Sequence, residues 1–171
     1  ITALGLSGIV FVSNVVQKHI EYAVSQKIPC VLVNSYSDKL PSVLSDNRKG
    51  AYLAGRYLIE HGHKTVALLA GVRSYLSNQE RTAGFLQAFQ EEGLSIPPEL
   101  ILETGSWLYD AAEKVCLNFF NTYTGEMPTA LFAFNDRLAT GAINAICKTG
   151  RTVPDDVSVI GYDNLGYYNI I

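Results

Sequence analysis

One uninterrupted stretch, from Ser45 to Gly71, constrains the fold of this chain more than any other part of the sequence. In its first half, small and apolar residues recur at the spacing of a helix face: Ala51, Ala54, Gly55 and Leu58. Gly62 marks the end of this helix, because glycine adopts a left-handed backbone at little cost. The run from Thr65 to Ala70 is then almost wholly apolar, as a parallel strand covered on both faces must be. The stretch therefore predicts one helix-and-strand unit of an α/β protein.

Units of the same kind fill the rest of the chain. Short apolar runs predict six strands, at residues 9–12, 30–33, 65–70, 100–102, 129–134 and 157–161. Helical patterns lie between these runs, and Gly93 and Gly150 mark two further helix ends. Residues 37–44, which include Asp38 and Pro41, are predicted to form a loop. Strands that alternate with helices predict the α/β fold class, with parallel sheets flanked by helices.

Capping patterns predict where two of the helices begin. Residues 77–80, with Ser77 first and Glu80 last, match a capping box. Asp110 stands where it can cap the helix that follows. Both residues are therefore expected to bond the first backbone N–H groups of a helix.

Composition excludes several classes of protein. The chain of 171 residues has a formal net charge of −3, and it lacks the clustered Lys and Arg of a nucleic-acid surface. No apolar run reaches the length of a membrane span, so no membrane partner is expected. Its three cysteines, Cys30, Cys116 and Cys147, lie on apolar faces of predicted elements. We expect them to be reduced, buried thiols of a cytoplasmic protein.

Catalytic and metal-binding signatures do not occur in the sequence. It contains no GxSxG, HExxH, GxxxxGK[ST], GxGxxG or CxxC motif. His61 and His63 make an incomplete metal site, and a histidine at a helix end can instead bond the last carbonyl groups. We therefore expect no enzymatic activity, no cofactor and no metal. An enzyme that acts on sugars or nucleotides remains a weaker alternative, supported only by Asp136 and Asp163 at strand ends.

Polar side chains gather where the predicted strands end. In open parallel sheets, ligands bind beyond the carboxyl ends of the strands. Those ends carry Ser13, Asn34, residues 77–81, Ser106 with Trp107, Asn135 with Asp136, and Tyr162 with Asp163. Amides, carboxylates and a guanidinium can bond sugar hydroxyls, and the apolar face of a pyranose packs on an aromatic ring. The mixture predicts a neutral, polyhydroxylated ligand.

Four segments also carry a family resemblance. Residues 46–71, 81–89, 128–146 and 153–164 resemble, in order and spacing, the signatures of the LacI/GalR family of bacterial transcriptional regulators. The resemblance implies two α/β lobes of the periplasmic-binding-protein-like type I architecture, with a small-molecule effector, a sugar, in the cleft between them. The alternative from the same fold is a periplasmic or lipid-anchored sugar-binding protein of a transporter.

The resemblance also implies a division of the chain. Residues 1–45 would form a partial N-terminal lobe, residues 46–161 a complete C-terminal lobe, and residues 162–171 the crossover back toward the N-terminal lobe. The family's helix-turn-helix headpiece is missing, so operator DNA would be bound only through a headpiece outside this chain. A homodimer is expected, because such headpieces read two half-sites. A partial lobe is also expected to expose apolar strand edges.

The resemblance assigns effector contacts to six positions: Asn34, Ser77, Arg81, Trp107, Asn135 and Asp163. Arg81 resembles an arginine that clamps the effector, and Trp107 an aromatic residue that stacks on it.

Structural alternatives stay open for these positions. Ser77 and Asn135 can be helix caps, and Trp107 can be a packing residue. Arg81 can pair with a carboxylate such as Glu80, and Asp163 can serve a turn or bond across the lobes.

Overall fold

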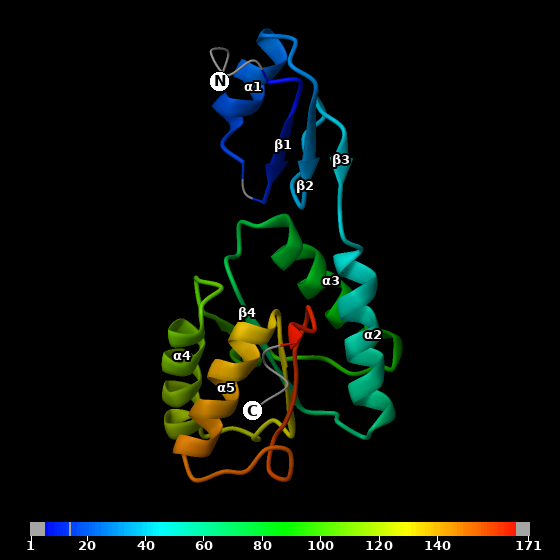
Figure 1. Cartoon of the computed structure of the whole chain (residues 1–171). Helices are drawn as coiled ribbons and strands as arrows, with labels where there is room; N and C mark the ends of the chain where they lie inside the picture. The colour runs from blue at the N-terminus through cyan, green and yellow to red at the C-terminus, as the bar shows by residue number, and fades with distance from the viewer. Residues whose placement is uncertain (1–5, 14, 167–171) are drawn as a thin grey trace. The chain divides into compact units, whose positions relative to one another are not determined.

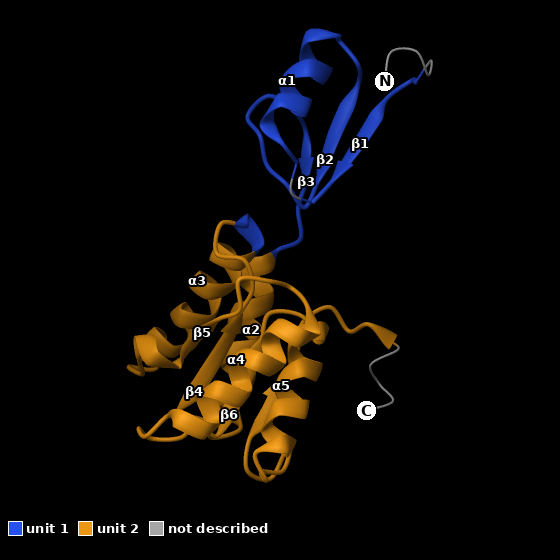
Figure 2. Ribbon diagram, turned by 90° about the vertical axis from the view of Figure 1, so that its left-hand side faces the viewer, with its two compact units in different colours: residues 1–46, 75–77 blue, residues 47–74, 78–171 orange. Residues whose placement is uncertain are grey.

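The computed structural model describes residues 6–13 and 15–166 (Figure 1). The chain divides into two compact units, coloured separately in Figure 2. Unit 1 contains Ile1–Asp46 with Tyr75–Ser77, and unit 2 contains Asn47–Ser74 with Asn78–Ile171. Each unit has its own parallel sheet. The predicted fold class, α/β with parallel sheets flanked by helices, is confirmed.

Unit 1 is a βαβ unit with a third short strand. Its elements are β1 (Ile9–Val12), α1 (Gln17–Ser25), β2 (Cys30–Val33) and β3 (Ser42–Val43). The sheet has the order β1-β2-β3, and both strand pairs are parallel. The positions of β1 and β2 agree with the prediction, whereas β3 lies in residues 37–44, which the sequence predicts to be loop. Two residues cannot show an alternating pattern, and β3 is held by backbone bonds such as Asn34 N–H to the Val43 carbonyl, at 2.9 Å.

Only one face of the unit 1 sheet is buried within the described residues. On that face, Leu32 is fully buried, and α1 contributes the buried Ile20 and Ala23. The strand register places five valines on the opposite face: Val10, Val12, Val31, Val33 and Val43. We call this set the valine face; Val10 and Val12 are 62% and 64% exposed. The sequence predicts exposed apolar strand edges, and the described residues show an exposed apolar face.

Unit 2 contains the larger sheet. Its strands are β4 (Val66–Ala70), β5 (Ile101–Glu103), β6 (Ala130–Ala133) and β7 (Ser158–Ile160), all parallel, in the order β5-β4-β6-β7. The main helices are α2 (Asn47–Glu60), α3 (Leu76–Glu91), α4 (Tyr109–Thr122) and α5 (Asp136–Lys148). A short 3-10 helix, Pro98–Leu100, precedes β5. With β3 included, the described residues form seven strands, one more than the sequence predicts.

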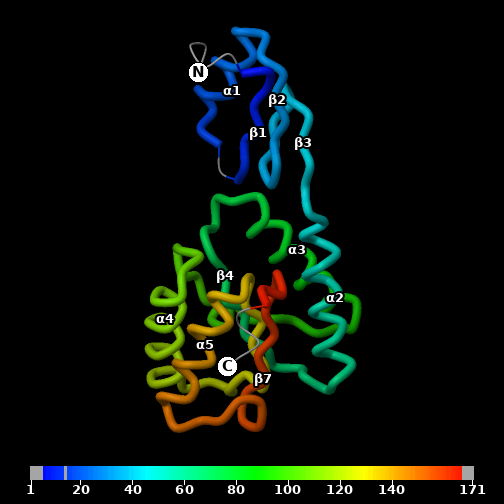
Figure 3. The backbone as a smooth tube through the Cα atoms, viewed as in Figure 1, coloured from blue at the N-terminus to red at the C-terminus, as the bar shows by residue number. Residues whose placement is uncertain are grey.

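Two helix pairs cover the unit 2 sheet. α4 and α5 run side by side (Figure 3), and the missing side chain of Gly141 lets them approach, since a Cβ there would lie 2.5 Å from the Tyr109 carbonyl oxygen. α2 and α3 meet in the same way at Gly84, where a Cβ would lie 2.0 Å from the Arg48 carbonyl oxygen. Between the helix pairs, every residue of β4 and β6 is buried. The core is thus a covered parallel sheet, as its apolar strands predict.

The helix ends agree with the sequence better than the helix starts. Gly62, Gly93 and Gly150 follow helices and have φ values of 86°, 68° and 80°, as predicted for glycine stops. The two predicted caps are wrong. α3 begins at Leu76, so Ser77 lies inside its first turn, and α4 has Leu108 as its N-cap, with Asp110 in the first turn. Carboxylates and hydroxyls are favoured throughout the first helical turn, so the pattern alone does not fix the capping position.

Candidate functional site

Arg81 is the centre of a polar cluster at the carboxyl ends of the unit 2 strands. Its side chain comes from α3, and the residue is only 9% exposed. Nε donates a hydrogen bond to Asn47 Oδ1 at 2.9 Å, and Nη1 donates to the carbonyl oxygen of Phe134, directly after β6. Nη2 lies 3.9 Å from Asp163 Oδ1, beyond the end of β7. A single guanidinium therefore contacts the start of α2 and the ends of two strands.

The face of the guanidinium is covered by Tyr162. Arg81 Cζ lies 3.6 Å from the centroid of the Tyr162 ring, which is close enough for a cation–π interaction. The ring packs against Gly50 of α2, where a Cβ would lie 2.5 Å from the Tyr162 hydroxyl oxygen. Burial lowers the pKa of Arg81, while the charge of Asp163 acts in the opposite direction. The guanidinium still remains charged, since its ordinary pKa lies far above neutral pH.

Asp163 is the exposed end of this cluster. Its side chain is 37% exposed, and its backbone has a φ of 104°, in the left-handed region. Asp and Asn occupy that region more readily than other non-glycine residues. Burial raises the pKa of Asp163, the nearby charge of Asp136 raises it further, and Arg81 opposes both. The Asp163 carboxylate is therefore an acceptor that a hydroxyl of a ligand can reach from solvent.

Asn135 connects the cluster to the loop after β5. Its Oδ1 accepts the Leu138 N–H at 2.7 Å, so it caps α5, and its Nδ2 donates to the Trp107 carbonyl oxygen at 3.3 Å. The neighbouring Asp136 accepts the Leu165 N–H at 2.6 Å. The capping role that the sequence left open for Asn135 is therefore observed. A cap and a ligand contact can coexist on one amide, because its oxygen has two lone pairs.

Trp107 is a packing residue of the same end of the sheet. A Cβ on Gly71 would lie 2.7 Å from its ring carbons, so the indole lies directly against the backbone after β4. The Gly71 N–H is bonded by Oδ1 of the buried Asn78, at 2.9 Å. The packing alternative for Trp107 is thus observed, and its stacking on an effector stays a prediction.

Asn34 and Ser77, the other two predicted contacts, belong to unit 1. Asn34 follows β2 with a φ of 53°, and its Oδ1 accepts a hydrogen bond from the Ser45 hydroxyl at 3.3 Å. Ser77 is half-buried in the first turn of α3. Of the six predicted positions, the structure brings Arg81, Asn135 and Asp163 to one end of the unit 2 sheet, with Trp107 beside them. Asn34 and Ser77 are described only within their own unit.

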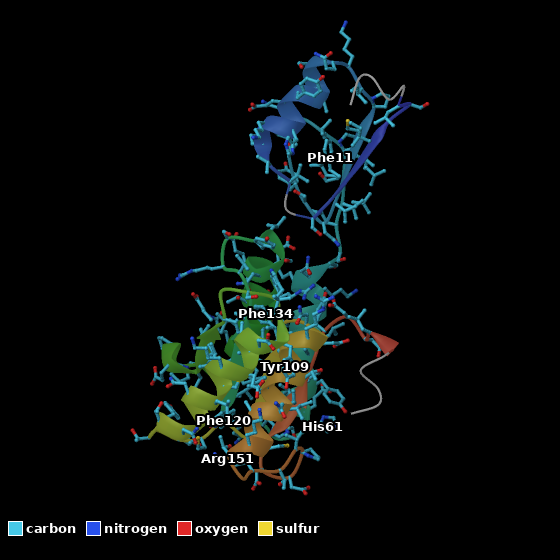
Figure 4. The ribbon with its side chains drawn as sticks, turned by 60° about the vertical axis from the view of Figure 1, so that its left-hand side comes forward. Phe11, His61, Tyr109, Phe120, Phe134 and Arg151 are labelled. Carbon is cyan, nitrogen blue, oxygen red and sulfur yellow. The ribbon has the colours of Figure 1, made fainter. Side chains whose placement is uncertain are left out.

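A second arginine lies on an aromatic ring at the opposite end of unit 2. Arg151 lies with its Cζ 5.5 Å from the centroid of the Phe120 ring, whereas Phe134 stands at the other end of the unit (Figure 4). His61 Nδ1 lies 2.8 Å from the Tyr57 carbonyl oxygen, and His63 Nδ1 lies 2.9 Å from the Thr129 hydroxyl. The helix-end role predicted for His61 is confirmed.

Neither metal ligation nor thiol chemistry contributes to the cluster. Over residues 6–13 and 15–166, no three His, Cys, Asp or Glu side chains are grouped so that they could hold a metal ion. Cys116 is buried, and burial raises its pKa to about 12, so the thiol is unreactive. Cys30 is half-buried and Cys147 is exposed, so the prediction of buried thiols is correct for Cys116 alone. α5 is amphipathic, and Cys147 lies near its end on the exposed side.

Asn47 is the member of the cluster that the sequence did not single out. It is the first residue of α2, 5% exposed, and it lies 34 positions before its partner Arg81. An asparagine at a helix start is common as a cap, so composition gives no sign of a contact with a distant arginine. Its position inside the segment 46–71 was the only available signal.

Comparison with known proteins defines the class to which this fold and this site belong. The family model of the periplasmic binding protein-like domain matches residues 56–169, which is more than half of the chain. The chain therefore belongs to the periplasmic binding protein-like domain family. None of the helices in the described ranges is long and apolar enough to cross a membrane.

The relatives narrow this class to LacI-family regulators. The chain is 37% identical over 141 residues to the HTH-type transcriptional repressor PurR of Aliivibrio fischeri, a match that covers 81% of this chain and 42% of that protein. It is 42% identical over 129 residues to the PurR repressor of Vibrio parahaemolyticus, covering 75% of this chain and 38% of the relative. The chain thus spans about two fifths of the length of the relatives it matches.

Solved structures agree with this placement. A LacI-family regulatory protein from Chloroflexus aggregans superposes with a TM-score of 0.88 at 26% identity, covering 99% of this chain and 61% of that one. A LacI-family regulator from Enterococcus faecium, solved with bound ribose, gives 0.85 at 26% identity, with 99% and 63% covered. The resemblance to the LacI/GalR family is confirmed, and the effector-binding domain of a regulator is favoured over the transporter protein. The relatives are named as transcriptional regulators, as the prediction of a non-enzymatic chain expects.

Proposed function

We propose that this chain is the effector-binding core of a LacI-type transcriptional regulator and that it binds a small polyhydroxylated effector, a sugar, beside Arg81. The observation that carries the proposal is the convergence on one buried guanidinium of groups from α2, the residue after β6 and the segment after β7. A buried charge costs free energy unless it is well paired, so such a cluster is rarely retained for stability alone. It lies at the carboxyl ends of parallel strands, where ligands of such sheets bind.

The charges of the cluster favour a neutral ligand. Asp136 lies close enough to Asp163 for its charge to raise the pKa of Asp163, and Arg81 is the cation that pairs with Asp163. A phosphorylated ligand would meet more negative than positive charge at this position. Sugar hydroxyls, which both donate and accept, can instead bond the Asp163 carboxylate and the amide of Asn135 while a ring face packs on Trp107.

The proposed mechanism is linkage between two lobes. In this proposal, residues 1–45 are a partial N-terminal lobe and residues 46–161 are the C-terminal lobe. Residues 162–171, of which 167–171 lie outside the described residues, are the proposed crossover between the lobes. An effector held by Arg81, Asn135 and Asp163 on one side of the cleft and by Asn34 on the other favours one lobe arrangement. That bias changes the operator affinity of a headpiece outside this chain, in a cytoplasmic homodimer.

A thermal-shift screen of the full chain against pentoses, hexoses and nucleobases tests the proposal. A ligand that binds only the folded state stabilises it by about 2.7 kcal/mol at a concentration 100 times Kd. The melting temperature therefore rises. We expect a sugar to give the largest shift, and we expect Arg81→Ala and Asp163→Asn to remove it.

Two exposed sites provide matched controls. Arg56 pairs with Glu60 and Glu92 on the surface, and Asp156 bonds Thr152, so Arg56→Ala and Asp156→Asn should keep the full shift. If Arg81→Ala and Asp163→Asn bind as tightly as the unmodified chain, the effector is bound elsewhere and the proposed site is wrong.

A further inference from the structure

The side chain of Asn47 is a buried amide beside the proposed effector site. It is 5% exposed and stands at the first residue of α2, where the chain enters unit 2. Its Oδ1 accepts from Arg81 Nε at 2.9 Å, and its Nδ2 donates to Glu80 Oε2 at 3.1 Å. The amide therefore bridges two consecutive side chains of α3 from a different helix.

The chemistry of the two partners fixes the orientation of this amide. Arg81 Nε can only donate, and the ionised Glu80 carboxylate can only accept. Only one of the two amide orientations satisfies both partners, with the oxygen toward Arg81 and the nitrogen toward Glu80. Glu80 therefore fixes the Asn47 amide in the orientation in which its oxygen accepts from Arg81.

The amide also completes a three-sided support for the guanidinium. The Phe134 carbonyl oxygen accepts from Nη1 in the plane, and the Tyr162 ring covers one face at 3.6 Å. Neither contact prevents the guanidinium from shifting along its own plane. The hydrogen bond from Nε to Asn47 restrains the end of the planar group that joins the aliphatic side chain. A long arginine side chain otherwise loses substantial rotamer entropy when it must take a single position for a ligand.

We propose that Asn47 is a positioning residue for Arg81, fixing the guanidinium before the effector arrives; for its effect on affinity this rests on the effector site proposed above. The amide acts through Arg81 and does not touch the effector. Asn47 directly follows Asp46, where the chain first passes from unit 1 to unit 2. Its bond therefore also ties the effector arginine to that point of the chain.

The first test needs no effector. In 15N-labelled full-length chain, the Arg81 Nε–H resonance, assigned by its loss in Arg81→Lys, should exchange slowly with water. Asn47→Ala should speed that exchange about tenfold or more, because the acceptor is lost. In the double variant Asn47→Asp, Glu80→Gln, residue 80 becomes the donor and residue 47 the acceptor of the bond between them, and the net charge is unchanged. Residue 47 still offers an oxygen to Arg81 Nε–H, so slow exchange should be restored. Asn144→Ala, which removes a comparable amide bonded to Tyr109 and Glu113 away from Arg81, should leave it unchanged.

The second test measures affinity by calorimetric titration, with ribose and with every other member of the screen that shifts the melting temperature. Asn47→Ala should weaken binding about tenfold or more, and the double variant should recover most of the loss. Asn144→Ala should lose stability without losing affinity, which separates positioning from a general effect on folding.

The outcomes distinguish this inference from the proposed function. If Arg81→Ala leaves binding unchanged, or if no member of the screen binds, the proposed site fails, and the exchange experiment alone decides whether Asn47 positions Arg81. If Arg81→Ala abolishes binding but Asn47→Ala changes neither the affinity nor the Nε–H exchange by more than about twofold, the positioning role is overturned. A double variant that behaves like Asn47→Ala would also overturn it, since it would show that the reversed bridge does not replace the native one.

Discussion

The sheets of the two units are built from similar strands but bury them differently. In unit 2, β4 and β6 are buried at every residue, because helices cover both faces of the sheet. In unit 1, β1 alternates between half-buried and exposed residues, and the valine face is open within the described residues. Apolar strand residues are thus necessary for a covered parallel sheet but do not produce one without a second helix layer. The difference shows that the strand sequence determines which residues are apolar enough for a core. The helix layers around the sheet determine which of those residues are buried.

Polar groups differ between the units in the same way. Unit 2 places Asn47, Asn78 and Arg81 at 9% exposure or less, and each has hydrogen-bond partners within the unit. In unit 1, the polar residue after β2, Asn34, is exposed and bonds the exposed Ser45. Burial of polar groups requires partners that cannot move away, and only the packed end of unit 2 supplies them in the described residues. The three predictions that follow test this contrast.

The largest expected effect comes from a cavity in the covered sheet. Phe132→Ala in β6 removes a fully buried ring that stacks on Phe85 at 4.9 Å, and it should lower the free energy of unfolding by about 3–5 kcal/mol. Val12→Ala on the valine face should change it by less than about 0.5 kcal/mol, because that side chain is already exposed. Urea denaturation followed by circular dichroism measures both. Equal losses in the two variants would mean that the valine face is covered in solution.

A middle-sized effect is expected at the contact between α2 and α3. Gly84→Ala would place a Cβ 2.0 Å from the Arg48 carbonyl oxygen, so the helices must separate. We expect a loss of about 1–3 kcal/mol, the usual range for overpacking. Gln90→Ala, on the exposed side of the same helix, is the matched control and should be close to neutral. Thermal unfolding of the two variants decides, and a Gly84→Ala protein as stable as the Gln90→Ala protein would show that the helix pair is not closely packed there.

The smallest effect is a pH dependence from Asp163. Because burial raises its pKa in the folded chain, the unfolded chain releases the proton first as the pH rises. Stability should therefore fall as the pH rises from the unfolded pKa, about 3.9, through the raised folded pKa, and then level off. Asp163→Asn removes this loss, so at neutral pH it should be more stable than the unmodified chain, by less than about 1 kcal/mol for a carboxylate this exposed. Unfolding curves at pH 3.5 and 7 test the sign. A variant that is less stable at pH 7 would show that attraction to Arg81 outweighs burial.

Much of the architecture could be predicted from the sequence because it is encoded locally. The apolar run at residues 65–70 became β4, and Gly62, Gly93 and Gly150 end their helices with left-handed backbones. β3 could not be predicted, because two residues held by backbone bonds to β2 leave no side-chain pattern. The positions of the caps were wrong by two residues for a similar reason, since several first-turn positions suit the same polar side chains.

The candidate site was predictable in its location but not in its partnerships. Parallel strands carry their carboxyl ends to one edge, so Arg81, Asn135 and Asp163 were expected to gather there, and they do. The hydrogen bonds of Asn47 with Arg81 and Glu80 were not predictable, because nothing in the sequence around Asn47 or around Arg81 marks the other segment as its neighbour.

The sequence by itself determined the alternation of strands and helices, the apolar residues available for a core and the family to which the chain belongs. These follow from periodicity, glycine stops and segment signatures, which act over a few residues at a time. Tertiary structure decided which apolar residues are buried and which acceptors hold the guanidinium of Arg81. Those outcomes depend on how closely separate helices approach, at Gly84 and Gly141 for example. Close approach is a property of packed pairs of elements rather than of either one alone.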